Sequence, residues 1–278
     1  MQPLAGVEVV SLAVNLPGPL AAARLAELGA SVHKVEPPSG DPLAVAAPDW
    51  YRALIANQQV VALDVKQDTE RAKLDELLAT ADLLITSMRP TALARLGLDR
   101  PHEKFPELSL IEIVGHAEDA EVPGHDLNYQ ALHGTLTPPQ MPPVPIADML
   151  GAERAVSTAL AALVRRAETG VGQPYRVALE DAAARAGDAV RYRLMGPGAV
   201  LGGAFPGYGI YECRDGHVAL GAVEPHFFMR TLETFGADGS HESLQAAFAE
   251  RTVAELEAVA AQVDLPLNGI RTPTLDGK

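Results

Sequence analysis

Residues 7–36, VEVVSLAVNLPGPLAAARLAELGASVHKVE, decide the fold of this chain. The apolar run at 7–12 is typical of a short buried strand, and the turn at 15–19 separates it from a helical segment at 20–28. A second strand is predicted at 32–36. Strand, turn, helix and strand in this order predict a parallel βαβ unit.

The same alternation continues along the chain. Strands are predicted at 60–65, 82–86 and 108–114, with a helix at about 68–80 and a short helix before 108. Strands that alternate with helices favour a largely parallel sheet covered by helices on both faces. The fold class is therefore α/β, with a Rossmann-like large domain.

A proline-rich loop interrupts this pattern at 137–145, TPPQMPPVP, because five prolines exclude a helix or a central strand. The loop leads to Asp148. An apolar stripe with spacings of three and four predicts a helix at 151–168, and another helix is expected at about 179–194.

A small α+β domain is predicted after the glycine-rich stretch 196–209. Segments 209–212 and 217–221 are expected to pair as a hairpin, and helices follow from about Pro225 and Ser243. The predicted domains are 1–195, the large α/β domain, and 196–278, the small domain with its tail.

Composition excludes several classes of partner. The chain has 278 residues and a net charge of −14, which opposes binding to nucleic acid and to anionic membranes. A single cysteine, Cys213, cannot form an internal disulfide. The amino terminus lacks a basic secretion signal, and no apolar run is long enough to span a membrane, so we expect a cytoplasmic protein.

Three common active-site patterns are missing from the sequence. The first turn contains only Gly18, so the G-x-G-x-x-G pattern for dinucleotide binding is absent. No G-x-S-x-G is present for a serine hydrolase. The spacing of His116, His125 and His133 does not favour a metal site, and none is predicted.

Three titratable residues stand in unusual local contexts. His125 lies in PGHDLNY, Asp148 follows the proline loop directly before a helix, and Glu224 lies in GAVEP after the hairpin. Each also has a structural interpretation, as a hydrogen-bonded turn histidine, a helix cap and a solvated turn residue. Local spacing alone leaves both interpretations open.

Longer stretches resemble the family III CoA-transferases of the CaiB/BaiF type. The resemblance covers PLAGVEVVSL…GPLAAARLAELGASVHKVEPPSGD at 3–41, VALDVK at 61–66 and DLLITSMRPTALARLGLD at 82–99. PGHDLNYQALHG at 123–134 and YGIYECRDGHVALGAVEPHFF at 208–228 are similar to the α-methylacyl-CoA racemase branch.

This resemblance implies an acyl-CoA racemase that inverts a 2-methylacyl-CoA by two-base 1,1-proton transfer through an enolate. His125 and Asp148 correspond to the two acid/base groups, and Glu224 to the glutamate that supports the histidine. Amides at the start of the helix beyond Asp148 are expected to stabilise the enolate oxygen. The residues predicted to bind CoA are Lys34, Arg89, Gly124, Asp126 and Tyr129.

The resemblance also implies that the substrate is an acyl-CoA, that no cofactor is required beyond its CoA, and that the protein forms a homodimer. Two differences from the family pattern affect these expectations. Pro37, Gln58 and Gln59 stand where basic residues are usual, which leaves Lys34 and Arg89 as the clearest cations. The chain is also shorter at its carboxyl end than is usual in the family, so we expect the interlocking of the dimer to be incomplete.

Two alternatives remain open at this stage. In the transferase branch, the aspartate at the position of Asp148 attacks an acyl-CoA and forms an aspartyl intermediate. The altered basic positions instead favour a catalytically weakened protein that keeps the fold as a binding or assembly subunit. His125 together with Glu224 favours the racemase.

Overall fold

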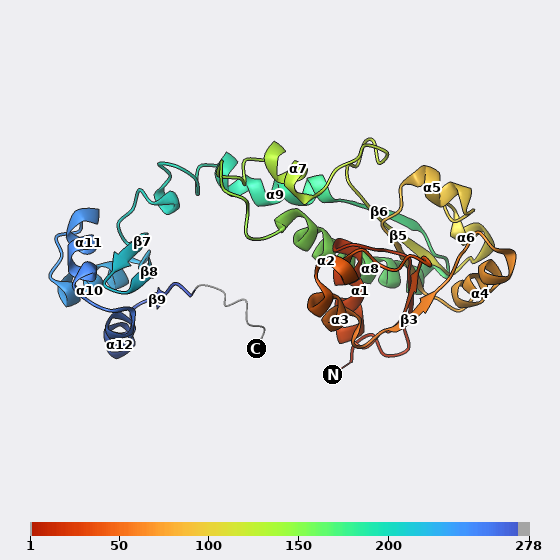
Figure 1. The fold of residues 1–278 in the computed structure, drawn as a ribbon, viewed down its shortest axis with the longest axis horizontal. Helices are drawn as coiled ribbons and strands as arrows, with labels where there is room; N and C mark the ends of the chain where they lie inside the picture. Colours follow the sequence, from red (N-terminus) through yellow and green to blue (C-terminus); the bar gives the residue numbers. More distant parts are fainter. Residues whose placement is uncertain (1, 272–278) are drawn as a thin grey trace. The chain divides into compact units, whose positions relative to one another are not determined.

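The computed structural model describes residues 2–271, and the chain divides between Gly187 and Asp188 into two compact units (Figure 1). Each unit has its own sheet and its own apolar core. The domain limits of 1–195 and 196–278 remain a prediction. None of the helices described is both long enough and apolar enough to cross a bilayer.

The first unit contains a six-stranded parallel sheet with the strand order β3-β2-β1-β4-β5-β6. Its strands are β1 (Glu8–Ser11), β2 (Ser31–Glu36), β3 (Gln59–Ala62), β4 (Leu83–Thr86), β5 (Ser109–Val114) and β6 (Pro174–Ala178). The chain builds outward from β1 to β3 and then returns to place β4 beside β1. In such sheets, ligands bind outside the carboxyl ends of the strands at this reversal.

Helices cover both faces of this sheet (Figure 1). The helices in this part of the chain are α1 (Pro17–Glu27), α2 (Leu43–Ala46), α3 (Pro48–Ile55), α4 (Asp68–Leu78), α5 (Pro90–Arg95), α6 (Pro101–Lys104), α7 (Asp126–Leu132), α8 (Ile146–Thr169) and α9 (Leu179–Arg191). Successive strand residues face opposite sides, so Val9 packs with α1 and α8 whereas Val10 packs with α4 and α5. The predicted α/β fold with a parallel sheet is confirmed.

Helix α8 begins at Ile146, before the start that the apolar stripe predicts at residue 151. Pro145 precedes its first turn, where a proline is tolerated because the first amides of a helix have no partner within it. The helix ends at Gly170, whose φ of +73° lies in the left-handed region that glycine adopts without strain.

Strand β6 is absent from the sequence-based prediction. It lies at the edge of the sheet, begins with a proline, and leads directly into α9 without a turn. Its pairing with β5 joins residues about 64 positions apart, such as Glu112 and Arg176, and this long-range contact leaves no local signal.

The second unit is built on a three-stranded antiparallel sheet of β7 (Tyr208–Cys213), β8 (Gly216–Gly221) and β9 (Leu267–Gly269). Its helices are α10 (Pro225–Phe235), α11 (His241–Ala249) and α12 (Val253–Val263), and a short 3₁₀ turn η1 (Val200–Gly202) precedes the sheet. Tyr211, Val218 and Leu220 pack against Phe235 and Phe248 in its core. The predicted hairpin is confirmed, and α12 and β9 extend the prediction.

Candidate active site

A cavity of 290 Å³ lies at the carboxyl ends of β1, β4 and β5, where the strand order reverses. Its wall combines polar and apolar groups, and the apolar side chains are those of Val14, Pro17, Met88, Ile113, Val114, Ala120, Val122 and Leu179. Its polar side chains are Asn15, Ser87, Arg89, His125, Tyr129 and Asp148. The cavity therefore brings together two of the three predicted catalytic residues, His125 and Asp148.

Asp126 links the segments that carry these two residues. It follows His125 directly, and its Oδ1 accepts hydrogen bonds from the amides of Ala147 (2.7 Å) and Asp148 (3.1 Å). Gln130 donates to Asp126 Oδ2 at 2.5 Å and to the carbonyl of Val144 at 3.1 Å, which ties α7 to the proline loop. The buried Asp126 carboxylate thus caps α8 and fixes Asp148 relative to α7.

Asp148 lies in the first turn of α8 rather than before the helix, which corrects its predicted position. Desolvation by burial, followed by the negative charge of Asp126, raises the pKa of Asp148 to about 7. Both protonation states of its carboxyl are consequently populated near neutral pH. A group of this kind can either accept or donate a proton.

The helix amides predicted to stabilise an enolate are already used within the protein. Ala147 and Asp148 donate to Asp126, and Met149 donates to the carbonyl of Pro145 at 3.0 Å. The Asp126 side chain thus occupies the amides of Ala147 and Asp148, and the amide of Met149, beyond Asp148, is bonded within the helix. Any oxygen bound in the cavity must find its donors elsewhere.

His125 lies at the N-cap of α7, with extended backbone angles and an exposed side chain on the cavity wall. Its amide donates to Asn128 Oδ1 at 3.0 Å, so the backbone is held while the imidazole remains accessible. This position satisfies both sequence interpretations, because the residue begins a helix and also faces the cavity.

Gly124 and Tyr129 also line the cavity. A Cβ atom at Gly124 would lie 2.8 Å from Tyr129 Oη, so the close approach of the tyrosine requires glycine there. The carboxylate of Asp126, by contrast, is occupied by its contacts with α8 and Gln130. Contact of any of these residues with CoA remains a prediction.

Glu224 belongs to the second unit, where it forms the N-cap of α10 just before Pro225. It is exposed within that unit. Its proposed support of His125 depends on how the two units associate, and it therefore stays a prediction.

Lys34 does not have the role predicted for it. Its side chain is 0% exposed, and Nζ lies 2.8 Å from Asp41 Oδ2, 3.3 Å from Glu36 Oε1 and 3.1 Å from the carbonyl of Ala13. An ammonium buried among these three oxygens has no accessible face for a phosphate. We therefore assign Lys34 to the structure of the β1–β2 edge rather than to CoA binding.

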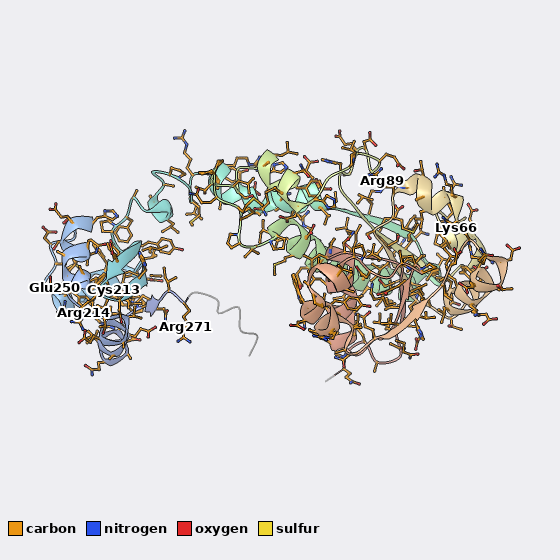
Figure 2. All side chains as sticks on the ribbon, in the orientation of Figure 1. Lys66, Arg89, Cys213, Arg214, Glu250 and Arg271 are labelled. Carbon is orange, nitrogen blue, oxygen red and sulfur yellow. The ribbon has the colours of Figure 1, made fainter. Side chains whose placement is uncertain are left out.

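Arg89 differs from Lys34 in each of these respects. It is an exposed residue at the amino end of α5, and it lines the cavity (Figure 2). Within residues 2–271 its guanidinium forms no ion pair. It is therefore placed to receive an anionic group of a ligand.

A cluster beside the cavity escapes the sequence analysis. Glu180, in the first turn of α9, is hydrogen-bonded through Oε2 to His116 Nδ1, and its Oε1 lies 3.4 Å from His133 Nε2. The hydrogen bond from His116 is the largest cause that lowers the pKa of Glu180. The clustering of histidines in the sequence points to two of these residues, but Glu180 is too distant in the chain to be recognised.

Comparison with known proteins assigns nearly the whole chain to one family. The model of CoA-transferase family III matches residues 4–275. The chain is 30% identical over 266 residues to a succinate–glutarate CoA-transferase of Agrobacterium fabrum, which covers 84% of this chain and 66% of that protein. It is 37% identical over 137 residues to a cinnamoyl-CoA:phenyllactate CoA-transferase of Clostridium sporogenes, which covers 44% of this chain and 33% of that protein.

Solved structures agree with the fold. A hypothetical protein of Mycobacterium tuberculosis superposes with a TM-score of 0.82 at 23% identity, over 98% of this chain and 86% of that one. The chain spans at most about two thirds of the two curated transferases that it matches. From the match along residues 4–275, the chain belongs to CoA-transferase family III.

Proposed function

We propose that this protein is an acyl-CoA racemase-like enzyme, which inverts a 2-methylacyl-CoA by proton transfer between His125 and Asp148. The observation that carries this proposal is that both side chains line one cavity, where the pKa of Asp148 is raised to about 7. An aspartate with an ordinary pKa is almost never protonated at neutral pH, so it is a poor proton donor.

The proposed reaction needs one base and one acid at the α-carbon. One group removes the α-proton, the C–H electron pair forms the enolate, and the other group returns a proton from the opposite side. In the opposite direction the two groups exchange roles, for which Asp148 must be stable in both protonation states. Apolar side chains on the wall, such as Met88, Ile113 and Leu179, can contact a branched acyl chain, and the proposed chemistry uses no cofactor beyond the CoA of the substrate.

Exchange of the α-proton in heavy water tests this proposal. The wild-type protein is expected to incorporate deuterium at the α-carbon of a 2-methylacyl-CoA while the configuration scrambles. Asp148→Asn is expected to slow racemisation by about 1,000-fold, the scale of general acid–base catalysis. His125→Ala is expected to abolish racemisation while single-sided exchange through Asp148 can persist.

Two control variants separate chemistry from folding. Asp181→Asn changes another aspartate in the first turn of a helix, and His241→Ala changes an exposed histidine in the second unit. Both should retain wild-type exchange. Absence of α-deuteration by the wild-type protein across a panel of branched acyl-CoAs would remove the basis of the racemase proposal.

A CoA-transferase is the second candidate, and the names of the two curated relatives favour it. Here the Asp148 carboxylate attacks the thioester carbonyl and expels CoA thiolate, which then attacks the aspartyl carbonyl of the mixed anhydride, releases the donor acid and leaves CoA on Asp148 as a thioester. An acceptor carboxylate takes this CoA by the same two steps in reverse, which frees Asp148. Hydroxylamine should trap the aspartyl intermediate and inactivate the protein. A hydroxamate or CoA adduct on Asp148, detected by mass, favours this candidate over the racemase.

The proposal includes a homodimer as the active form. Exposed apolar side chains occur along α7, α8 and the loop between them, and they include Leu127, Leu132, Met141, Val144, Met149 and Val164. Association of two copies would cover such side chains. Sedimentation analysis should show a dimer, and replacement of Leu132 and Val164 by lysine should shift it toward the monomer.

A further inference from the structure

Tyr129 is the most enclosed polar residue on the cavity wall. It is 1% exposed, and Cβ atoms at Gly115 or Gly124 would collide with its hydroxyl end. The ring is held between these two glycine positions, on the same cavity as Asp148. Within residues 2–271 its hydroxyl makes no hydrogen bond to another residue.

The backbone donors at the start of α8 and the Ser87 hydroxyl are committed to protein acceptors, whereas the Arg89 and His125 side chains lie exposed on the cavity wall. The amides of Ala147 and Asp148 donate to Asp126, and the Ser87 hydroxyl lies 3.5 Å from the carbonyl of Val14. An enolate formed at the α-carbon needs a donor that is fixed in position before the reaction. Tyr129 provides a donor whose ring is held in place on the cavity wall.

Three residues behind the wall support the tyrosine. The His116 ring contacts the edge of the Tyr129 ring, with centroids 5.3 Å apart and planes at 78°. Glu180 binds His116 through its side chain, and its amide donates to the carbonyl of Gly115 at 3.0 Å. Glu180 Oε1 also lies 3.4 Å from Nε2 of His133, the C-cap of α7, so α9 contacts both ends of the segment that carries Tyr129.

The surroundings keep the Tyr129 hydroxyl protonated. Burial, and then the charges of Asp148 and Glu180, raise the pKa of Tyr129 above its usual range. The residue therefore acts as a hydrogen-bond donor at neutral pH and does not itself exchange its proton with the substrate.

We propose that Tyr129 is a catalytic residue that donates a hydrogen bond to the thioester oxygen as it becomes an enolate oxygen, and that Glu180 is a positioning residue acting through His116. This inference rests on the proposed function. In the step concerned, the α-proton passes to His125 or Asp148, the C–H electron pair forms the C=C bond, and the carbonyl π electrons move to the oxygen. Tyr129 keeps its proton throughout.

Replacement of the hydroxyl alone gives the first test. Tyr129→Phe is expected to slow α-proton exchange by about 100-fold, the scale observed when one oxyanion donor is removed. Tyr175→Phe, on β6 and outside the cavity, removes the same atom and should leave the rate unchanged. A Tyr129→Phe protein that keeps its melting temperature and its wild-type exchange rate overturns the inference.

Binding of acetoacetyl-CoA separates this inference from the proposed function. This thioester ionises to an enolate with its own ultraviolet absorbance, and its binding needs no turnover. The wild-type protein should increase the enolate fraction, and Tyr129→Phe should reduce that increase by about 10-fold or more. Enolate binding that depends on Tyr129, without any exchange of 2-methylacyl-CoA, supports the donor and refutes the racemase. No enolate enrichment by the wild-type protein refutes the donor.

The role of Glu180 is tested by a double variant. Glu180→Ala should slow exchange by about 10-fold with little change in KM, whereas Glu168→Ala, on the exposed end of α8, should have no effect. If Glu180 acts through Tyr129, the double variant Glu180→Ala/Tyr129→Phe exchanges no more slowly than Tyr129→Phe alone. Additive losses would show that Glu180 acts only on the general structure.

Discussion

Two pairs of carboxylates lie near the carboxyl edge of the same sheet, and their surroundings are opposite. Glu36 and Asp41 share the buried ammonium of Lys34, which lies within 3.3 Å of an oxygen of each. Asp126 and Asp148 share no cation among the described residues, and Asp126 is satisfied by amides instead. The first pair is compensated and holds the fold together, whereas the second leaves Asp148 with a raised pKa in a cavity.

The difference shows that acidic residues acquire a structural or a chemical role through their partners. A buried charge with an opposite charge beside it gains an attraction that offsets part of the cost of its desolvation. A carboxyl that is desolvated beside a like charge titrates near neutral pH, which proton transfer requires. Removal of the partners in each pair should therefore affect different properties.

The largest expected effect is on the compensated pair. Lys34→Met leaves Glu36 and Asp41 buried without a cation, and loss of one partner of such a pair costs about 3–5 kcal/mol of unfolding free energy. Denaturation by urea measures this loss. Lys66→Met, at an exposed position of the same unit (Figure 2), should change stability by less than about 0.5 kcal/mol. A Lys34→Met protein of normal stability and weakened CoA binding would restore the role predicted from the sequence.

In the pair Asp126 and Asp148, removal of a charge should increase the stability of the folded protein. The folded-state pKa of Asp148, about 7, lies above its usual value of 3.8, so the folded protein binds this proton more tightly than the unfolded chain. The wild-type protein consequently loses stability as the pH rises from about 4 through 7. Asp148→Asn cannot lose a proton, and it should be more stable by about 4 kcal/mol at pH 8, with little difference at pH 4.

Unfolding in urea at the two pH values measures this difference. Asp181→Asn, which changes an exposed carboxylate, serves as the control and should show no gain at pH 8. Equal stabilities of Asp148→Asn and the wild-type protein at pH 8 would mean that Asp148 is solvated and ordinary. The contrast between the two carboxylate pairs would then fail.

A smaller effect is expected from Arg89, the exposed cation on the cavity wall, than from the buried Lys34. Arg89 is exposed and unpaired within residues 2–271, so Arg89→Ala should weaken CoA binding by about tenfold at low salt and less at high salt. Calorimetric titration at two ionic strengths measures this change. Arg95→Ala, on the same helix but outside the cavity, should bind CoA normally. Equal affinities of Arg89→Ala and the wild-type protein would exclude Arg89 from phosphate recognition.

Local sequence predicted much of the fold. The alternation of apolar runs and amphipathic helical segments predicts β1 to β5 and the hairpin, because the hydrophobic pattern of each element lies within its own short segment. Strand β6 and the early start of α8 depend on distant partners, namely β5 and Asp126. Such long-range contacts produce no hydrophobic periodicity within a short stretch of sequence.

The site was predictable to a similar degree. Motif resemblance identified His125 and Asp148, which the structure places on one cavity. It did not reveal that Lys34 is buried against Asp41, because burial depends on the packing of β1 and β2. It also missed Glu180, whose contact with His116 spans 64 positions.

The smallest expected effect comes from the charge of Asp126. Asp126→Asn retains an amide oxygen that can accept hydrogen bonds from Ala147 and Asp148, but it removes the negative charge that contributes to the raised pKa of Asp148. The pKa of Asp148 should therefore fall. Where Asp148 acts as the base, the rate rises with ionisation of its carboxyl, so the acidic limb of the exchange profile should move to lower pH. Asp99→Asn, an exposed change outside the cavity, should leave the profile in place. Because desolvation is the larger cause of the raised pKa of Asp148, Asp126→Asn should remove only part of that pKa elevation. A limb that does not move would assign the raised pKa to burial alone, and a limb that moves to higher pH would contradict the assignment of Asp148 as the group that titrates.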